Sequence, residues 1–147
     1  MSVPAKSSPD HHDAELMLRV YELRRESVMR DARNAINGQF WPRTYEDILA
    51  VTKADHPLNP SWRQTASYWE MIYGFARHGI VDANFWAEGN GEGLFLYAKV
   101  APHLDRLRAE VNPVMFRNAE WLAGNTVEGR RLFELFTGRV KAALAAK

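Results

Sequence analysis

The sequence predicts an all-α protein, a single bundle-like domain of about five to seven helices. Apolar residues recur three or four positions apart along most of the 147-residue chain, which is the spacing of amphipathic helices. Asparagine before proline or glycine marks helix starts and stops, and no alternating strands joined by a hairpin dipeptide occur. Residues 1–10 mix Ser, Pro and Lys without periodicity, so we expect a flexible tail there and the helical domain in residues 11–147.

Composition limits the class of protein. Hydrophobic residues make up 46% and charged residues 25% of the chain, as in soluble globular proteins. Nineteen Lys and Arg against eighteen Asp and Glu leave a formal charge of +1, too little for a strong nucleic-acid binder. The sequence contains no cysteine, which excludes disulfides and thiolate metal sites. No apolar run reaches the roughly 18 residues of a membrane span or resembles a signal peptide, so we expect a cytoplasmic protein without a cofactor.

Two helices are expected in the first third of the chain. The first is long and amphipathic, from residue 14 to about residue 36, with Asp10 or Asp13 as its N-cap. A short second helix follows Thr44, which precedes Asp47 by three residues in a pattern that resembles a capping box. Both assignments depend on a side-chain oxygen that accepts from an unpaired N–H in the first turn.

The third helix has the clearest boundaries. Asn59 is the expected N-cap, Pro60 takes the first helical position, and Gly79 follows the last turn. Its aromatic and aliphatic residues form a very wide arc, so this helix should be central in the fold. Glu70 lies on the narrow polar arc, facing away from the core, together with Arg63, Ser67, Gly74, Arg77 and His78.

The C-terminal half is expected to contain several helical segments. Asp82 can cap a short helix. Residues 94–111 have helical spacing, but Pro102 within them predicts a kink or two helical pieces. The Asn112-Pro113 pair should start another segment, and Thr126 can cap the last helix.

Several central segments carry a family resemblance. An aromatic helix containing YWEM is closed by HGIVD and followed by NGEGLFLYAKVAPHLDRLR, and the first helix contains YELRRE. Together these segments, over roughly residues 14–110, resemble a bacterial all-helical domain family of unknown function. The resemblance implies a helical domain in a bacterial protein and carries over no activity.

One polar cluster is the candidate for a ligand-binding site. Arg25 emerges from an apolar stripe of the first helix, where an arginine often pairs or snorkels. We expect a structural ion pair between Arg25 and Glu70 that fixes how two helices meet. The alternative is an anion or carboxylate pocket made by Arg63, Arg77 and His78, in which Glu70 holds the arginines in place.

Aromatic loop residues and the basic last helix are the candidates for a partner-binding surface. Phe40 and Trp41 lie in an expected loop, and large aromatics are favoured interface anchors. Packing over the end of the bundle is the alternative for both. The last helix carries Arg130, Arg131 and Arg139, which suit an acidic partner, nucleic acid or a membrane surface, or an ordinary solvated face.

No metal or catalytic motif accompanies these candidates. The five histidines form no His-Glu-x-x-His and no repeated Glu-x-x-His pair. The GNGEG segment follows no strand, and no Gly-x-Ser-x-Gly elbow occurs. We therefore expect a non-catalytic helical module that binds another protein or itself. The alternative is a small-molecule or anion-binding protein, with or without an activity, that uses the polar cluster beside the third helix.

Overall fold

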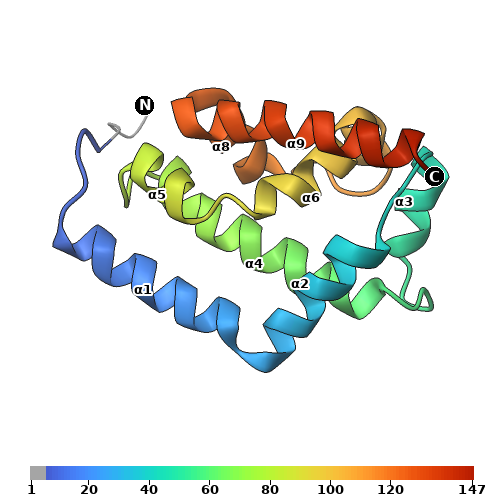
Figure 1. The fold of residues 1–147 in the computed structure, drawn as a ribbon, viewed down its shortest axis with the longest axis horizontal. Coiled ribbons are helices and arrows are strands. Elements are labelled where there is room, and N and C mark those ends of the chain that lie inside the picture. Colours follow the sequence, from blue (N-terminus) through green and yellow to red (C-terminus); the bar gives the residue numbers. More distant parts are fainter. Residues whose placement is uncertain (1–5) are drawn as a thin grey trace.

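The structure, a computed structural model, describes residues 6–147 and confirms the all-helical class. The described part of the chain contains nine α-helices, one short 3₁₀-helix and no strand, packed around one hydrophobic core (Figure 1). In chain order the helices are α1 (His11–Arg25), α2 (Ser27–Gln39), α3 (Tyr45–Val51), α4 (Asn59–Arg77), α5 (Ala83–Gly89), α6 (Gly93–Val100), η1 (Ala101–His103), α7 (Leu104–Glu110), α8 (Arg117–Asn125) and α9 (Val127–Ala145).

The count exceeds the expected five to seven because two long predicted helices are broken. The helix expected from residue 14 to 36 is interrupted at Glu26, which has φ −58° and ψ 142° between α1 and α2. That extended ψ turns the chain, so α1 and α2 form a V in Figure 1. The Glu26 carboxylate accepts hydrogen bonds from the N–H groups of Val28 and Met29 and thereby caps α2.

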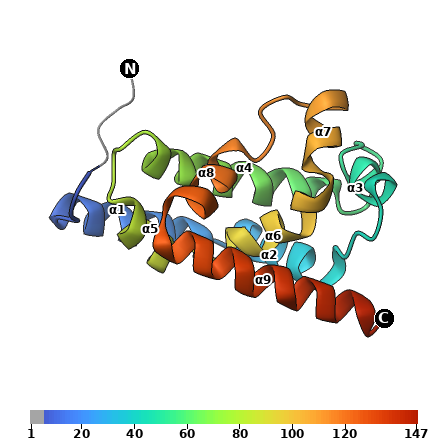
Figure 2. The same cartoon turned by 90° about the horizontal axis from the view of Figure 1, so that it is seen from above.

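The second break is the one that Pro102 predicts. Helix α6 ends at Val100, the next three residues form η1, and α7 starts at Leu104. Proline has no N–H to donate to the carbonyl one turn earlier, so the α-helical hydrogen bonds stop there. The chain then turns into α7, which stands beside α3 at one end of the molecule (Figure 2).

Most predicted helix starts are confirmed, and two differ. Asn59 is the first residue of α4 rather than its cap, and its side chain donates to the carbonyl oxygen of Val51. The Asn112-Pro113 pair does not start a helix: α8 begins at Arg117, after Phe116 in the left-handed conformation at φ 57°. The confirmed N-caps, each accepting from an N–H of the first turn, are Asp10, Thr44, Asp82 and Thr126.

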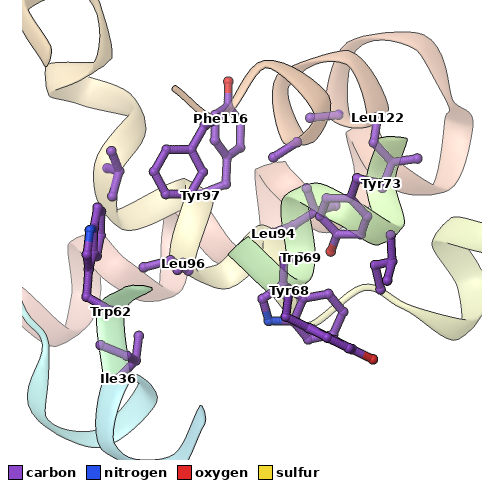
Figure 3. Close-up of a cluster of buried hydrophobic side chains, with 14 of the residues drawn as sticks. Ile36, Trp62, Tyr68, Trp69, Tyr73, Leu94, Leu96, Tyr97, Phe116 and Leu122 are labelled. Carbon is purple, nitrogen blue, oxygen red and sulfur yellow. The ribbon is translucent and has the colours of Figure 1, made fainter. Parts of the chain in front are cut away.

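The core lies between α4 and α6. Helix α4 is central, as its wide apolar arc predicts, and all of α6 except Phe95 is buried. Helix α9 covers α6 on the side away from α4, so α9, α6 and α4 follow one another down Figure 1, and α2 packs across α4. Figure 3 shows aromatic side chains of α4 gathered against aliphatic and aromatic side chains of α6 and α8. No described helix is both long enough and apolar enough to cross a membrane.

Part of the predicted N-terminal tail lies against the domain. Residues 1–5 are outside the described residues, but the Lys6 ammonium lies 2.6 Å from Asp13 and 3.0 Å from Asp10. Asp13 is fully buried and also accepts a hydrogen bond from the N–H of Asp82. Asp13 therefore ties α1 to the start of α5.

Candidate functional site

Glu70 caps a helix that is remote in the sequence. Its carboxylate accepts a hydrogen bond from the N–H of Asn118 at 3.0 Å and another from the N–H of Ala119 at 2.8 Å. Both donors lie in the first turn of α8, where N–H groups have no partner within the helix. The N-cap residue itself is Phe116, which makes no side-chain cap hydrogen bond. Glu70 of α4 therefore supplies the missing acceptor.

Asn118 strengthens the same contact between α4 and α8. Its Nδ2 donates to the Glu70 backbone carbonyl at 2.8 Å, and its Oδ1 accepts from Nε of Arg77 at 2.6 Å. Gly74 makes room for this side chain, because a Cβ at that position would lie 3.0 Å from Asn118 Nδ2. The glycine within α4 thus permits the close approach of another helix.

The environment of Glu70 favours a role as a hydrogen-bond acceptor over a role in proton transfer. Burial raises the pKa of its carboxyl above the ordinary value, and the N–H groups of Asn118 and Ala119 offset part of that rise. Both carboxylate oxygens already accept from backbone donors. Glu70 is therefore half-buried and engaged in holding α8.

The predicted ion pair between Arg25 and Glu70 is wrong. Arg25 is exposed at the end of α1, with its guanidinium 5.4 Å from the centre of the Tyr21 ring. Glu70 takes its hydrogen bonds from α8 instead. Helical phase gives the side of α4 on which Glu70 lies, but it does not identify the element that packs there.

The structure also separates the other residues of the predicted ligand cluster. Arg63 and Arg77 lie about 20 Å apart along the axis of α4, at about 1.5 Å per residue. Nε of Arg77 donates a hydrogen bond to Asn118 of α8, and NH2 of Arg77 lies 3.2 Å from Nε2 of His78. Only Arg63 and Glu70 line one hollow. The arrangement expected for an anion pocket of two arginines and a histidine is not present in residues 6–147.

A groove runs along the outer face of α4, and we call it the α4 groove. It consists of two hollows of about 700 and 370 Å³ that share Ser67 and Met71. The elbow between α1 and α2 borders it on one side, and residues 112–118 border it on the other. Its lining includes Leu23, Glu26, Met29, Arg63, Glu70, Met71, Val114, Met115 and Arg117.

Flexible apolar side chains line the α4 groove. Three of the five methionines of the chain, Met29, Met71 and Met115, line it, although Met29 is only 3% exposed. Methionine is unbranched and adaptable, and it is over-used at surfaces that bind varied partners. Leu23 is 46%, Met71 49% and Val114 47% exposed. Apolar surface therefore faces solvent on the elbow, on α4 and on the 112–118 segment.

The acids of the α4 groove cap helix ends, whereas its arginines form no ion pair, although the charge of Arg117 offsets part of the rise that burial causes in the pKa of Glu70. Glu26 caps α2 and Glu70 caps α8, so the partial positive charge of a helix N-terminus offsets each carboxylate. Hydrogen bonding from the N–H of Val28 lowers the pKa of Glu26. Within the described residues, Arg63 and Arg117 form no ion pair. Arg63 and Arg117 are both exposed, so the groove presents two guanidinium groups to solvent beside its capping acids.

A second groove lies between α9 and α6, and we call it the α9 groove. Its volume is about 650 Å³. One wall is aromatic: Phe95 packs edge-on against Trp41 and Phe136, with ring centres 5.8 and 5.5 Å apart. Edge-to-face contacts at these distances are favourable pairings of aromatic rings. The rings of this wall are therefore packed against one another.

The arginines of the α9 groove, and two of its three acids, have partners within the protein, and Glu88 is the exception among the described contacts. Nε of Arg131 lies 3.0 Å from the Glu128 carboxylate. Glu92 accepts from Nε and NH2 of Arg33 at 2.6 and 2.9 Å. Arg139 lies over an aromatic ring of its own helix, 5.7 Å from the ring centre. These contacts leave few unsatisfied groups for a ligand.

Lys99 is buried beneath the aromatic wall and is only 2% exposed. Its Nζ donates to the carbonyl oxygens of Ile36, Asn37 and Phe40 at 3.1, 3.3 and 2.7 Å, and so closes the C-terminus of α2. Three acceptors match the three N–H bonds of an ammonium group. Burial acts in the opposite direction and lowers the pKa of Lys99 to about 7. The ammonium also lies 3.9 Å from the centre of the Trp41 ring.

The predicted partner-binding residues divide between the core and the α9 groove. Phe40 is 4% exposed and packs edge-on against a tryptophan of α4, so it is a core residue and not a surface anchor. Arg130 is exposed and donates to a carbonyl oxygen near the end of α8. The three candidates that line the α9 groove are Trp41, Arg131 and Arg139.

Lys99 and the three groove methionines were not predicted as site residues. A signal for Lys99 exists, because it is the single charged residue in the apolar run LFLYAKV. The methionines give no such signal, since they are widely spaced along the chain and only the fold brings them together. In residues 6–147 no group of three or more His, Asp or Glu side chains is placed to hold a metal ion.

Comparison with known proteins identifies a family. A family model described as "Domain of unknown function (DUF4760)" matches residues 9–126, which confirms the predicted resemblance to an uncharacterised family. The match includes the whole α4 groove and ends before α9. No curated protein matches the chain, and no solved structure matches it either.

Proposed function

We propose that this chain, which belongs to the DUF4760 family, is a non-catalytic helical module that binds a partner protein along the α4 groove. The observation that carries the proposal is the combination of adaptable and exposed apolar side chains in one groove. Met71 is half exposed on α4, and Leu23 and Val114 are exposed on opposite walls. Apolar residues that line a groove and are rimmed by polar ones mark interaction sites.

The position of the groove within the family match supports the proposal. All the residues that line the α4 groove fall between residues 9 and 126. The α9 groove, in contrast, needs α9, which lies outside the matched residues. If the interaction is common to the family domain, the α4 groove is therefore the better candidate for its binding surface.

Charge disfavours a second copy of this chain as the partner. In a two-fold symmetric contact the same patch faces itself. Arg63 and Arg117 of one copy would then share the contact with the same arginines of the other, while the only groove acids, Glu26 and Glu70, already cap helices. We expect the isolated chain to be monomeric in light scattering, and a stable dimer that buries Met71 would redirect the proposal toward self-association.

A small carboxylate or other anion is the second candidate occupant. Arg63 and Arg117 line the same hollow of about 700 Å³, and guanidinium groups bind carboxylates well. Native mass spectrometry of the purified protein separates this function from the first. A copurified small anion that is lost in an Arg63→Gln variant favours the ligand site, and a bare monomer favours protein docking.

Site-specific photo-crosslinking, carried out in cells that naturally contain the protein and its partners, tests the proposed function. The crosslinking residue p-benzoylphenylalanine replaces Met71 or Val114 in the α4 groove, or, as a matched control, Leu135 on α9. All three side chains are between 41% and 49% exposed. The proposal expects one discrete adduct from the two groove positions and none from Leu135. Equal crosslinking from all three positions, or from Leu135 alone, contradicts it.

A further inference from the structure

We infer that the segment of the partner that docks in the α4 groove is an acidic amphipathic helix. This inference rests on the proposed function and names the chemistry of the partner. It concerns three features of the groove: its adaptable apolar lining, its direction along a helix, and its unpaired arginines.

The form of the groove favours a helix over an extended segment. Residues 6–147 contain no strand, so no sheet edge is available to which a peptide strand could add. The groove aromatics Trp62, Tyr68 and Phe116 are each at most 7% exposed, so they present no open aromatic slots for a proline-rich segment. A helix laid into a hydrophobic groove is the recognition mode that remains available.

The spacing of the α4 residues defines the direction of the bound helix. Arg63, Ser67 and Met71 follow one another at intervals of four residues and form one stripe along α4. The elbow and the 112–118 segment border this stripe on its two sides. A partner helix that runs along the stripe presents apolar residues at positions i, i+4 and i+7 to Met71 and Met115.

The charges of the groove favour an acidic partner. Glu26 and Glu70 accept hydrogen bonds from the N–H groups of α2 and α8, so the helix N-termini offset part of their charge, and of the two arginines only Arg117 acts on Glu70. Arg63 and Arg117 form no ion pair with another described residue. Carboxylates beside the apolar stripe of the partner helix would pair with them, and complementary charge fixes the orientation of a docked segment.

A peptide selection against the full chain tests the inference. The probe is a displayed library of 16-residue peptides with apolar residues fixed at i, i+4, i+7 and i+11 and random residues elsewhere. Wild-type protein should enrich Asp and Glu over Lys and Arg at the random positions. The double variant Arg63→Glu/Arg117→Glu should reverse this preference and should bind the acidic peptides about tenfold more weakly.

Methionine methyl NMR shows where the selected peptides bind. With ¹³C-labelled methionine methyl groups, the signals of Met71 and Met115 should shift on binding. Met17 provides an internal control, because it contacts the Gly89–Asn90 turn instead of the α4 groove. A central proline in the peptide should reduce affinity by more than about tenfold, since proline breaks the helix.

Three results would overturn the inference, and they differ in what they leave standing. Peptides that shift Met71 but show no acidic preference refute the charge assignment and leave the proposed function intact. Peptides that keep their affinity with the central proline refute the helical form alone. A selection without binders, or binders that shift only Met17, refutes both the inference and the docking function of the α4 groove.

Discussion

The larger hollow of the α4 groove and the α9 groove are similar in volume, about 700 and 650 Å³, but the two grooves differ in how many of their lining side chains have partners within the protein. In the α9 groove the rings pack against one another and the arginines have acidic or aromatic partners. In the α4 groove Leu23, Met71 and Val114 stay exposed, and Glu26 and Glu70 cap helices. Volume alone therefore does not identify a docking site, which depends on whether the lining side chains are exposed and without partners.

The largest change in stability is expected where α9 meets α8. A Cβ at Gly129 would overlap the backbone oxygen of Leu122, which cannot move aside as a side chain can. Gly129→Ala should therefore lower the free energy of unfolding in urea by about 3 kcal/mol. It should disturb the α9 groove and leave the Met71 methyl signal in place. Gly138→Ala on the same helix meets nothing within 4 Å and should raise stability by up to about 1 kcal/mol; equal losses would contradict this packing.

The next largest effect is expected from Lys99, beneath the α9 groove. Lys99→Met removes three hydrogen bonds to carbonyl oxygens at the end of α2. We expect the free energy of unfolding to fall by about 2 kcal/mol, because buried acceptors lose their donor. Lys141→Met, at an exposed position of α9, should change stability little. A Lys99→Met protein as stable as the wild type would show that the buried ammonium costs as much as its hydrogen bonds contribute.

Lys99 also gives stability a defined pH dependence. The pKa of Lys99 is about 7 in the folded protein, against 10.5 as its ordinary value in an unfolded chain. Between these pH values the unfolded chain binds more protons than the folded one, so the free energy of unfolding contributed by Lys99 rises with pH. Urea titrations from pH 6.5 to 10 should show this rise in the wild type and in Lys141→Met. Lys99→Met should lack it, and the same slope in all three proteins would contradict the assignment.

A smaller effect is expected at Glu70, on the side of the α4 groove. Glu70→Gln leaves one acceptor oxygen where two N–H groups of α8 need one each, so stability should fall by about 1 kcal/mol. Because burial raises the pKa of Glu70, the folded state binds its proton more tightly than the unfolded state. Its contribution to stability therefore falls as pH rises from the ordinary value of 4.5 through the folded pKa. Glu70→Gln should remove that fall, whereas Glu134→Gln, on the exposed face of α9, should retain it.

The helix ends were predictable where they depend on neighbours in sequence. Thr44 and Asp47 form their capping box within one turn, and Pro102 stops α6 through its own missing N–H. The break at Glu26 was not predictable from periodicity, because the apolar residues continue in helical phase across it. A single extended ψ turns the chain there, and tertiary packing on α4 holds the elbow.

The candidate site was less predictable, since its groups come from distant segments. Helical phase puts Glu70 on the polar side of its helix, but its hydrogen-bond donors lie 48 and 49 residues away in α8. The three groove methionines come from α2, from α4 and from the segment before α8. Hydrophobic periodicity marks each as apolar within its own element, and only the packing of these elements shows that they share one surface.

Two matched surface substitutions should change stability least. They also test most directly whether the α4 groove, and not the surface of α9, is the docking site. Met71 in the α4 groove and Leu135 on α9 are 49% and 41% exposed, and both lie on long helices. Met71→Glu and Leu135→Glu should each change the free energy of unfolding by less than about 0.5 kcal/mol, as exposed substitutions usually do. Met71→Glu places a carboxylate in the groove, where it removes apolar contact and repels an acidic helix. It should abolish binding of the selected acidic peptides and crosslinking from Val114, while Leu135→Glu preserves both. If the two variants bind equally well, the exposed apolar residues of the α4 groove do not form the docking surface.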